Sequence, residues 1–577
     1  MKNSEIALMF DELAQLLELR GENAFRVRAY RTAARGIADL EDSVAEILAD
    51  PSRDLTNYPG IGSTIAEKCR LLVDTGQLPQ LEELRASTPP VLMKMTRIPG
   101  LGIKKAMLLQ QELGISSLEE LRQACIDQRV RHLKGFAAKT ETLILQGIAI
   151  AEAAALRLRI DQAERLVARL RQHLQDCEEI EKMEFAGSYR RGKETVGDID
   201  VLVVSSQAAQ VMDQLATFPG MVSQTARGET KMSIRVDDQF QVDLRVVGAE
   251  SFGAALQYFT GSKEHNVAIR SRARKLGLTV NEYGVAKLEQ PDASFAGETE
   301  QALYRALGLN WIAPELREGR HEIDWAEVGH LPPPLIELQH IVADLHMHTT
   351  ATDGNNTLEE MSAAARAIGL QYIAVTDHSQ RVSMARGLNA ERLLQQWSQI
   401  DAYNARQVDG FRVLKGIECD ILEAGPMDLP DEVLAQADWV IGSIHYGQKQ
   451  SRTQITDRLV GALANPHVDL IAHPTGRLIG SRPPYEVDME AVIQAAVEFR
   501  KALELNSNPQ RLDLNEEHLM AAARASVPIA INTDAHSVEG LEIMRFGITQ
   551  ARRALLERDE VLNTWPLEKL LKFVQRD

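Results

Sequence analysis

Short amphipathic patterns separated by glycine-containing turns fill residues 1 to about 150, with almost no alternation of period two. A longer helical pattern at about 156–176 then leads into four runs typical of strands, MEFAGS, DIDVLVV, MSIRV and FQVDLRVV. A helical stretch at 251–276 and the strand-like GLTVNEYG follow. This order predicts a helical N-terminal part and then a mixed α/β domain.

The last part of the chain alternates short apolar runs with helical stretches, which is the pattern of a parallel sheet or barrel. The runs are YIAVTDH, FRVLKGIE, WVIGSIH, DLIAHP, KALELNS and PIAINTD. Before them, the segment 311–340 contains ELREGR and LPPPL, and three consecutive prolines exclude a continuous helix or central strand. We therefore expect a linker followed by a C-terminal βα domain.

Composition narrows the class of protein. A length of 577 residues predicts several domains, and 44% hydrophobic with 25% charged residues is ordinary for globular proteins. No run approaches the roughly 18 apolar residues that span a membrane, and MKNSEIALMFDEL lacks a basic region before an apolar block, so we expect a cytoplasmic protein. The four cysteines form no CxxC pair, which argues against a disulfide framework or a thiolate zinc site. The net charge of -18 means that any contact with DNA must come from local basic patches.

One motif, PGxGxxxA, occurs twice in the helical part. Gly60 and Gly62 belong to the first copy, and Gly100 and Gly102 to the second, which continues with Lys104. Two glycines let a turn between short helices take positive φ and expose N–H groups at a helix N-terminus, where a phosphate oxygen binds well. The motif resembles the helix-hairpin-helix clamp on DNA backbone, although a single copy would suggest only a tight turn between helices.

Lys68 lies inside the first copy. Its amine suits a phosphate contact, and it also suits nucleophilic attack on an abasic-site aldehyde if burial and nearby cations lower its pKa. The spacing alone favours neither role.

The sequence FAGSYRRGKETVGDIDVLVV carries the first strong chemical signal. Asp198 and Asp200 would share one face of a strand, and Asp243 in FQVDLRVV can lie beside them. Three carboxylates suit two Mg²⁺ or Mn²⁺ ions and an in-line phosphoryl transfer, in which Gly187, Ser188 and Arg191 would hold a triphosphate. The alternative, a solvated strand edge, fits poorly with so apolar a strand.

GSxRRG, GDIDVLV, VDLR and YFTGS together resemble the family X, beta-type DNA polymerases over about residues 20–315. The resemblance implies metal binding by Asp198, Asp200 and Asp243, and help from Asp243 in deprotonating the primer hydroxyl. It also implies nucleotide contacts by Gly187, Ser188, Arg191, Gly197, Tyr258, Phe259, Gly261 and Asn266, and a template contact by Arg270. Lys68 matches the family's Schiff-base lysine, although Phe25 and Thr64 replace the His and second Lys of the lyase pattern.

Nine metal-ligand residues close strand-like runs in the last part of the chain. They are His346, His348, Asp353, His378, Glu418, His445, His473, Asp534 and His536, with Asp377 and Asp420 nearby. One strand-end histidine is usually structural, but strand ends of a βα barrel converge on one mouth. The set resembles the polymerase-and-histidinol-phosphatase (PHP) domain, which implies three divalent metals (Zn²⁺, Mn²⁺ or Fe²⁺) and phosphoesterase activity. We expect phosphodiester substrates, with small phosphate monoesters as the alternative. Four arginines that follow the motif ends could contact a DNA backbone or be solvated loop residues: Arg381, Arg386, Arg477 and Arg482.

We therefore predict a multidomain α/β and α+β protein. The segments are 1–85, helical and lyase-like with the first helix-hairpin-helix; 86–153, fingers-like with the second; 154–250, nucleotidyltransferase palm; 251–318, thumb; 319–340, linker; and 341–577, PHP barrel. The expected function is a monomeric short-gap-filling DNA polymerase of repair, using gapped or primer-template DNA and deoxynucleoside triphosphates. It would also have 3'-5' exonuclease and abasic-site endonuclease activity. The alternative makes the PHP domain the only enzyme and the front half a DNA-docking module.

Overall fold

The structure, a computed structural model, describes residues 3–20, 22–38, 43–50, 53–58, 60–96, 98, 101–155, 157–237, 240–291, 293–327 and 334–574. The chain divides into two compact units, one made of residues 1–153 with the short segments 353–357 and 480–483, and one made of the rest. Among the described residues, no helix is both long enough and apolar enough to cross a membrane.

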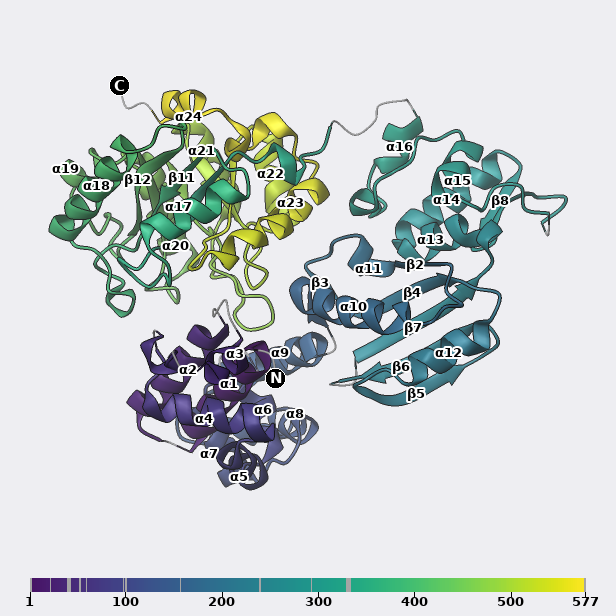
Figure 1. The fold of residues 1–577 in the computed structure, drawn as a ribbon, viewed down its shortest axis with the longest axis horizontal. Helices are drawn as coiled ribbons and strands as arrows, with labels where there is room; N and C mark the ends of the chain where they lie inside the picture. The colour runs from purple at the N-terminus through teal and green to yellow at the C-terminus, as the bar shows by residue number, and fades with distance from the viewer. Residues whose placement is uncertain are drawn as a thin grey trace. The chain divides into compact units, whose positions relative to one another are not determined.

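The first unit is helical, as predicted (Figure 1). Its apolar side chains form one core that runs from Ile6 to Ile148, because each short helix turns one apolar stripe inward. Its α-helices are α1 (Asn3–Leu19), α2 (Ala24–Ala38), α3 (Val44–Ala49), α4 (Ser63–Thr75), α5 (Pro79–Ser87), α6 (Pro90–Thr96), α7 (Ile103–Leu113), α8 (Leu118–Ile126) and α9 (Ala138–Ala155).

A five-stranded sheet in the order β2-β4-β7-β6-β5 opens the second unit. Its strands are β2 (Lys182–Phe185), β4 (Asp198–Val204), β5 (Met221–Arg227), β6 (Lys231–Val236) and β7 (Phe240–Val247). The four predicted runs give β2, β4, β6 and β7. Strand β5 was not predicted, since it is an edge strand whose residues after Met221 are all exposed and show no apolar alternation.

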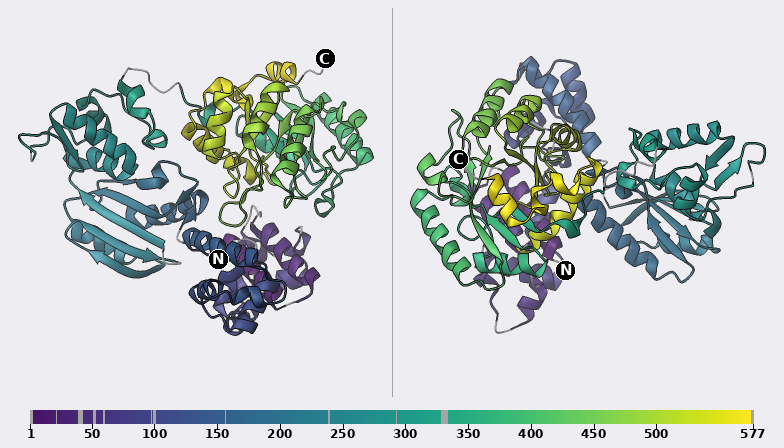
Figure 2. Two further views of the ribbon diagram at one scale, coloured as in Figure 1. Left: turned by 180° about the vertical axis from the view of Figure 1, so that it is seen from behind. Right: turned by 90° about the horizontal axis from the view of Figure 1, so that it is seen from above.

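Helices cover both faces of β4. Ile199, Val201 and Val203 share a core with α10 (Ile160–Gln175) and α12 (Ala208–Ala216). Leu202 and Val204 pack with α13 (Phe252–Thr260) on the opposite face. Figure 1 shows α10 and α12 in front of the sheet, whereas in the view from behind the strands β5–β7 have no helix before them (Figure 2).

A smaller α/β region follows the sheet. It contains α14 (Lys263–Lys275), the hairpin β8 (Leu278–Asn281) with β9 (Gly284–Lys287), and α15 (Glu300–Ala306). The predicted linker is more ordered than its prolines suggested: α16 spans Glu322–Glu327, and Leu335 bridges to Glu557 while Ile336 is fully buried. Residues 328–333, which include two of the three prolines, lie outside the described residues.

Seven parallel strands in sequence order, β10 to β16, build the rest of the second unit. The strands are β10 (Ala343–Met347), β11 (Tyr372–Val375), β12 (Arg412–Asp420), β13 (Trp439–Ser443), β14 (Leu470–Ile471), β15 (Ala502–Asn506) and β16 (Ile529–Asn532). A parallel bridge between Met347 and Ala535 brings the last strand back to the first, so the sheet is a nearly closed barrel. The predicted fold class is confirmed.

One apolar cluster contains residues of all seven strands, so it fills the barrel interior. Leu562 and Leu570 join this cluster, the latter from α24 (Leu567–Phe573). A larger cluster packs the outside of the strands against the surrounding helices. These are α17 (Leu358–Ala367), α18 (Ala390–Ala405), α19 (Asp431–Leu434), α20 (Arg452–Ala464), α21 (Met489–Glu498), α22 (Glu516–Arg524) and α23 (Met544–Arg553).

Candidate metal centres and nucleotide site

The three predicted carboxylates of the palm meet on one face of the sheet. Asp198 and Asp200 alternate with Ile199 in β4, so both turn away from the α10 and α12 core. Strand β7 runs parallel to β4 in a register that makes Asp243 the direct partner of Asp200. Gly187 has φ +63°, and a Cβ there would lie 2.4 Å from Oδ2 of Asp200, so the turn before the carboxylates requires glycine.

The electrostatics of this cluster call for a cation. Burial, with repulsion from Asp198 and Asp243, raises the pKa of Asp200 to about 7. Burial and the charge of Asp243 also raise the pKa of Asp198. Asp243 accepts hydrogen bonds from Ser233 Oγ and, at 2.8 Å, from Gln241 Nε2. Three half-buried carboxylates, of which Asp198 and Asp200 resist ionisation, fit divalent ions, which would hold all three charged.

An open cavity of about 390 Å³ lies beside the carboxylates, within the usual range for ligand sites. The helical turn α11 (Gly187–Arg190) and the segment from Tyr258 to Arg270 form its walls. Its lining includes Gly187, Ser188, Arg191, Asp198, Asp200, Tyr258, Phe259, Gly261, Asn266 and Arg270. Of the predicted nucleotide contacts only Gly197 is not part of this wall; a Cβ on it would lie 3.0 Å from Arg157 Nη1.

Arg191 and Asn266 are two of the cavity residues that hydrogen-bond to the protein itself in this structure. Arg191 donates to Glu318 Oε1 from Nε at 3.1 Å and to the Thr260 carbonyl from Nη1. The Asn266 amide donates to the Tyr258 carbonyl at 2.7 Å and accepts from Gln257 at 2.9 Å. A bound nucleotide would therefore have to compete for both side chains.

The first glycine motif forms the expected turn before α4. Gly60 has the positive φ expected of the turn, at +79°, whereas Gly62 and Gly102 are N-caps of α4 and α7 in extended backbone, with φ -81° and -69°. A Cβ on either would meet no atom within 4 Å, so their backbone stays open to approach. Gly100 lies outside the described residues, as does the side chain of Lys104.

Lys68 lies on α4, on the side that faces Tyr30. Its Nζ donates to Gln80 Oε1 at 2.7 Å and lies 6.0 Å from the centre of the Tyr30 ring. Partial burial and the charge of Arg26 lower the pKa of the Lys68 amine, which favours the neutral form that a nucleophile needs.

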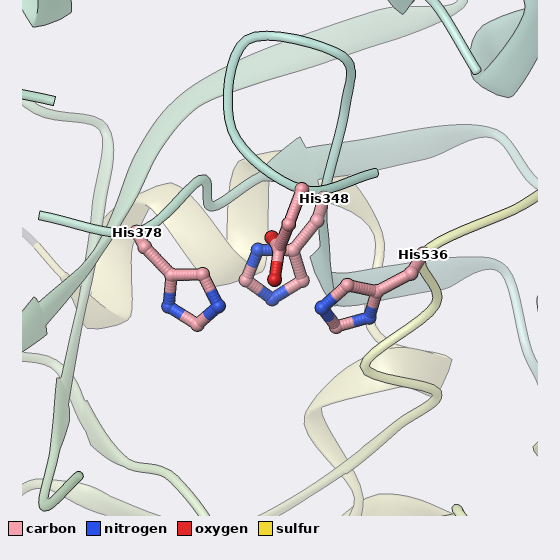
Figure 3. A group of neighbouring side chains, drawn as sticks. His348, His378 and His536 are labelled. Atoms are coloured by element: carbon pink, nitrogen blue, oxygen red, sulfur yellow. The ribbon is translucent and has the colours of Figure 1, made fainter. Parts of the chain in front are cut away.

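Eight of the nine predicted ligands of the C-terminal domain lie on or just after the C-terminal ends of barrel strands. The ninth, Asp353, lies in the loop after β10. Ligand atoms lie within 4.8 Å of one another in three groups: His348, Asp353, His378 and His536; His346, His348 and Asp534; and His378, Glu418 and His445. Figure 3 shows the His348 ring between those of His378 and His536, whose centroids are 4.3 and 4.2 Å away.

Glu418 lies at the centre of the histidines. Its Oε2 is 2.7 Å from His378 Nδ1, and its Oε1 is 3.1 Å from His473 Nε2 and 3.4 Å from His445 Nε2. His473, which belongs to none of the three groups, thus still joins the cluster. A carboxylate with histidines at both oxygens is suited to bridge two cations.

The burial of the cluster also fits bound metal. Burial and repulsion from His536 and His378 lower the pKa of His348 to about 4, so its imidazole stays neutral. His346 Nε2 and Glu418 Oε2 are buried and make no well-aligned hydrogen bond among the described residues, although Glu418 Oε2 lies 2.7 Å from His378 Nδ1. The neutral imidazole of His348 and a buried carboxylate oxygen in one site are donors that suit a divalent metal centre.

A second layer of polar residues orients the ligands, and the sequence revealed only part of it. Asp377 accepts from Thr349 and Gln396, and Asp420 lies 3.2 Å from His445 Nδ1. Glu504 was missed: it is fully buried in β15, and its Oε1 lies 2.7 Å from His346 Nδ1. An acid inside an otherwise apolar strand is the signal that would have found it.

Two of the four arginines predicted to contact DNA have protein partners in this structure. Arg386 donates to the Thr352 carbonyl but stays exposed. Arg477 is 9% exposed and pairs with Glu194 at 2.7 Å, so its guanidinium does not face open solvent as a backbone contact requires.

Family models match five segments between residues 1 and 508. They are a helix-hairpin-helix domain at residues 1–78, a SAM-like helix-hairpin-helix tandem at 92–149, the DNA polymerase beta palm at 157–246, the DNA polymerase beta thumb at 255–318 and a PHP domain at 344–508.

Two kinds of relative match different lengths of the chain. A protein of Thermoanaerobacter sp. named a probable phosphatase is 31% identical over 241 residues, 39% of this chain and 91% of its own length. The DNA polymerase/3'-5' exonuclease PolX of Bacillus subtilis is 41% identical over 580 residues, covering all of both chains. The chain therefore belongs to the PolX family, which joins a beta-type polymerase palm and thumb to a PHP domain.

Proposed function

We propose that this protein is a DNA-directed DNA polymerase that fills short gaps during repair and trims 3' ends with its PHP domain. The relative of the same length whose name joins the two activities supports the pairing. The observation that supports synthesis is the strand register, which sets Asp243 directly opposite Asp200, two residues after Asp198 on the same face. The observation that supports trimming of 3' ends is the cluster of nine ligands at the barrel mouth.

In the proposed synthesis, Asp198, Asp200 and Asp243 hold Mg²⁺ or Mn²⁺. Such ions, when bound, neutralise the triphosphate and stabilise the charge of the in-line transfer. Ser188 and the start of α11 hold the phosphates, and the Arg191 guanidinium supplies charge-assisted bonds. Asp243 assists removal of the proton from the primer 3'-hydroxyl. Tyr258, Phe259 and Gly261 pack against the sugar, while Asn266 meets the base edge and Arg270 the template strand.

In the proposed trimming, the nine barrel residues hold Zn²⁺, Mn²⁺ or Fe²⁺. These ions, when bound, make hydroxide available near neutral pH and polarise the phosphodiester. Burial lowers the pKa values of His348 and His445, which keeps these two imidazoles neutral for this task, and Glu418 lies where it can bridge two of the ions. The same chemistry would serve the backbone beside an abasic site.

Each predicted segment receives a role in this proposal. Residues 1–85 and 86–153 grip phosphates through N–H groups beside Gly60, Gly62, Gly100 and Gly102, with Lys104 as a further cation. The palm at 154–250 and the thumb at 251–318 carry out DNA synthesis. The linker at 319–340 connects them to the PHP barrel at 341–577, which trims 3' ends. We further propose that the protein acts as a monomer in the cytoplasm, and that Lys68 is the nucleophile of an abasic-site lyase.

A 5'-labelled primer on a one-nucleotide gapped duplex tests the proposal, with Mn²⁺ and with or without nucleotides. Extension with nucleotides and shortening without them is the expected result. Shortening alone would reduce the palm to a DNA-docking module. Extension alone would redirect the barrel toward other esters.

A second candidate for the barrel alone is hydrolysis of small phosphate monoesters. The favouring observation is the 31% identity of residues in this region to a protein named a probable phosphatase. Release of inorganic phosphate from p-nitrophenyl phosphate, compared with nucleotide release from a 3' end, distinguishes the two substrates.

A further inference from the structure

Helix α23 of the PHP domain packs on the turn that follows α11 in the palm. Arg553 donates from Nη1 to the Arg191 carbonyl at 2.5 Å, and Gln550 donates from Nε2 to the Gly192 carbonyl at 2.8 Å. Both side chains are buried, at 1% and 3% exposure. Gly192 has φ +64°, and a Cβ on it would lie 2.2 Å from Thr549 Cγ2, so the turn fits closely against the helix.

The contact is part of a packed interface. Phe546 of α23 and Leu512 belong to the apolar core of the palm, with exposures of 7% and 0%. Arg477 pairs with Glu194 at 2.7 Å at the end of the same turn. The palm turn is therefore supported from the PHP side by apolar, backbone and charged contacts together.

One carboxylate joins the turn to Arg553. Glu318 Oε1 lies 3.1 Å from Arg191 Nε and 3.0 Å from Arg553 Nη2, while its Oε2 lies 3.6 Å from Lys193 Nζ. Arg553 is fixed in turn by Glu516 at 2.7 Å. Two cations besides Arg191 thus share Glu318, and the more buried of them comes from the PHP domain.

This sharing matters for nucleotide binding. A triphosphate at the palm would draw the Arg191 guanidinium away from Glu318, and a half-buried carboxylate that loses a partner is costly unless another cation remains. Arg553 and Lys193 are the cations that remain. At the same time, the two donors of α23 hold the backbone of residues 191 and 192, which sets the direction of the Arg191 side chain.

We propose that Arg553, with Gln550, is a positioning residue for nucleotide binding: through these contacts the PHP domain holds the phosphate-binding turn of the palm and neutralises Glu318 when Arg191 moves to the triphosphate. The inference rests on the proposed nucleotide site. It predicts that a change in the PHP domain, away from its metal ligands, alters the affinity of the palm for nucleotide.

The test is steady-state gap filling by the full-length protein, with nuclease activity measured on the same preparations. We expect Arg553→Met to raise KM for the incoming nucleotide roughly tenfold while kcat stays within about twofold. Gln550→Leu should raise KM by a smaller factor. The KM of Arg553→Lys should lie between those of Arg553→Met and the parent protein. Adding Glu318→Gln to Arg553→Met removes the uncompensated carboxylate and should restore part of the loss. Nuclease rates stay within about twofold throughout.

Arg545→Met is the matched control. Arg545 lies on the same helix and pairs with Glu164 of α10 at 2.8 Å, so the variant removes an interface ion pair without touching the turn. Its KM should not change. An equal rise of KM for Arg545→Met, or a parallel loss of synthesis and nuclease activity in the Arg553 variants, would mean a merely structural interface and overturn the inference. If Arg553→Met does not fold, the KM values of Arg553→Lys and Gln550→Leu test the inference in its place.

Arg191→Ala separates this inference from the proposed function. A raised KM in Arg191→Ala with an unchanged KM in both Arg553→Lys and Gln550→Leu rejects the positioning role alone. An unchanged KM in Arg191→Ala rejects the nucleotide site itself.

Discussion

Asp200 and Asp243 are direct partners in the parallel pair β4–β7, so their carboxylates project from neighbouring strands on the same face. With Asp198 two residues before Asp200, they form the acidic wall of the palm cavity. No basic residue forms an ion pair with Asp200 among the described residues, and burial, Asp198 and Asp243 oppose its charge more strongly than Arg245 and Arg191 favour it. The arrangement makes sense only if cations complete it.

Replacing both β4 carboxylates should stop synthesis and leave trimming intact. In Asp198→Ala with Asp200→Ala, the palm loses two of its three oxygen ligands, so we expect nucleotide incorporation to fall by more than about a thousandfold. Primer extension on gapped DNA measures it, and shortening of the same primer without nucleotides is the internal control. Persistent incorporation would mean that the palm assignment is wrong.

The charge of Asp200 should destabilise the protein when metal is absent. Its pKa is raised to about 7 in the folded state, from about 3.8, so the folded protein binds more protons than the unfolded chain between these values and loses stability as the pH rises through that window. At about 1.4 kcal/mol per pKa unit, the cost above pH 7 is on the order of 2–4 kcal/mol.

Asp200→Asn removes this cost, so the metal-free variant should unfold at a higher temperature than the parent, with a larger gain at pH 8 than at pH 5. Scanning calorimetry in a chelating buffer measures the gain. Asp213→Asn, which changes an exposed carboxylate paired with Arg227, is the control and should shift little. An Asp200→Asn gain that does not depend on pH would contradict the mechanism.

Two histidines at the C-terminal end of β10 should be needed for trimming but not for synthesis. His346→Ala with His348→Ala removes ligand atoms from two of the three metal-binding groups and leaves the palm untouched. We expect 3' shortening to disappear while gap filling continues, and bound metal per chain to fall in elemental analysis. Unchanged shortening would place the nuclease elsewhere in the chain.

Much of both sites could be predicted because their residues follow simple rules of position. The nine barrel ligands close apolar runs, and DID in an apolar strand signals two carboxylates on one face. Glu504 does not close its apolar run, so only its charge inside the otherwise apolar β15 could have revealed it. Arg477 looks like a free cation in sequence, and only the folded chain brings Glu194, far away in sequence, to within 2.7 Å of it. The backbone of Gly62 depends on how α4 begins, which the motif alone does not define.

Lys68 should form the covalent complex with DNA that contains an abasic site. Burial and Arg26 lower the pKa of its amine, so the reactive neutral fraction is larger than in an ordinary lysine at pH 7–8. Borohydride trapping should yield a covalent complex with the parent and none with Lys68→Ala, while Lys139→Ala, a change at an exposed lysine, keeps it. Equal trapping by Lys68→Ala would exclude it as the nucleophile.

Glu504 should control the metal affinity of the barrel without touching metal. It lies 2.7 Å from His346 Nδ1 through Oε1, which also accepts from Asn532 at 3.0 Å, and its Oε2 accepts from the His473 amide at 2.7 Å. In Glu504→Gln one of these oxygens becomes an NH₂ group that faces a donor, so His346 loses its orientation. Metal affinity should fall about 10- to 100-fold. Metal retained after dialysis against graded chelator measures this directly, and Glu432→Gln, at an exposed position on α19, should behave as the parent. Retention equal to the parent would show that the ligands hold their geometry without Glu504, and the role of the inner acid would then be confined to the stability of β15.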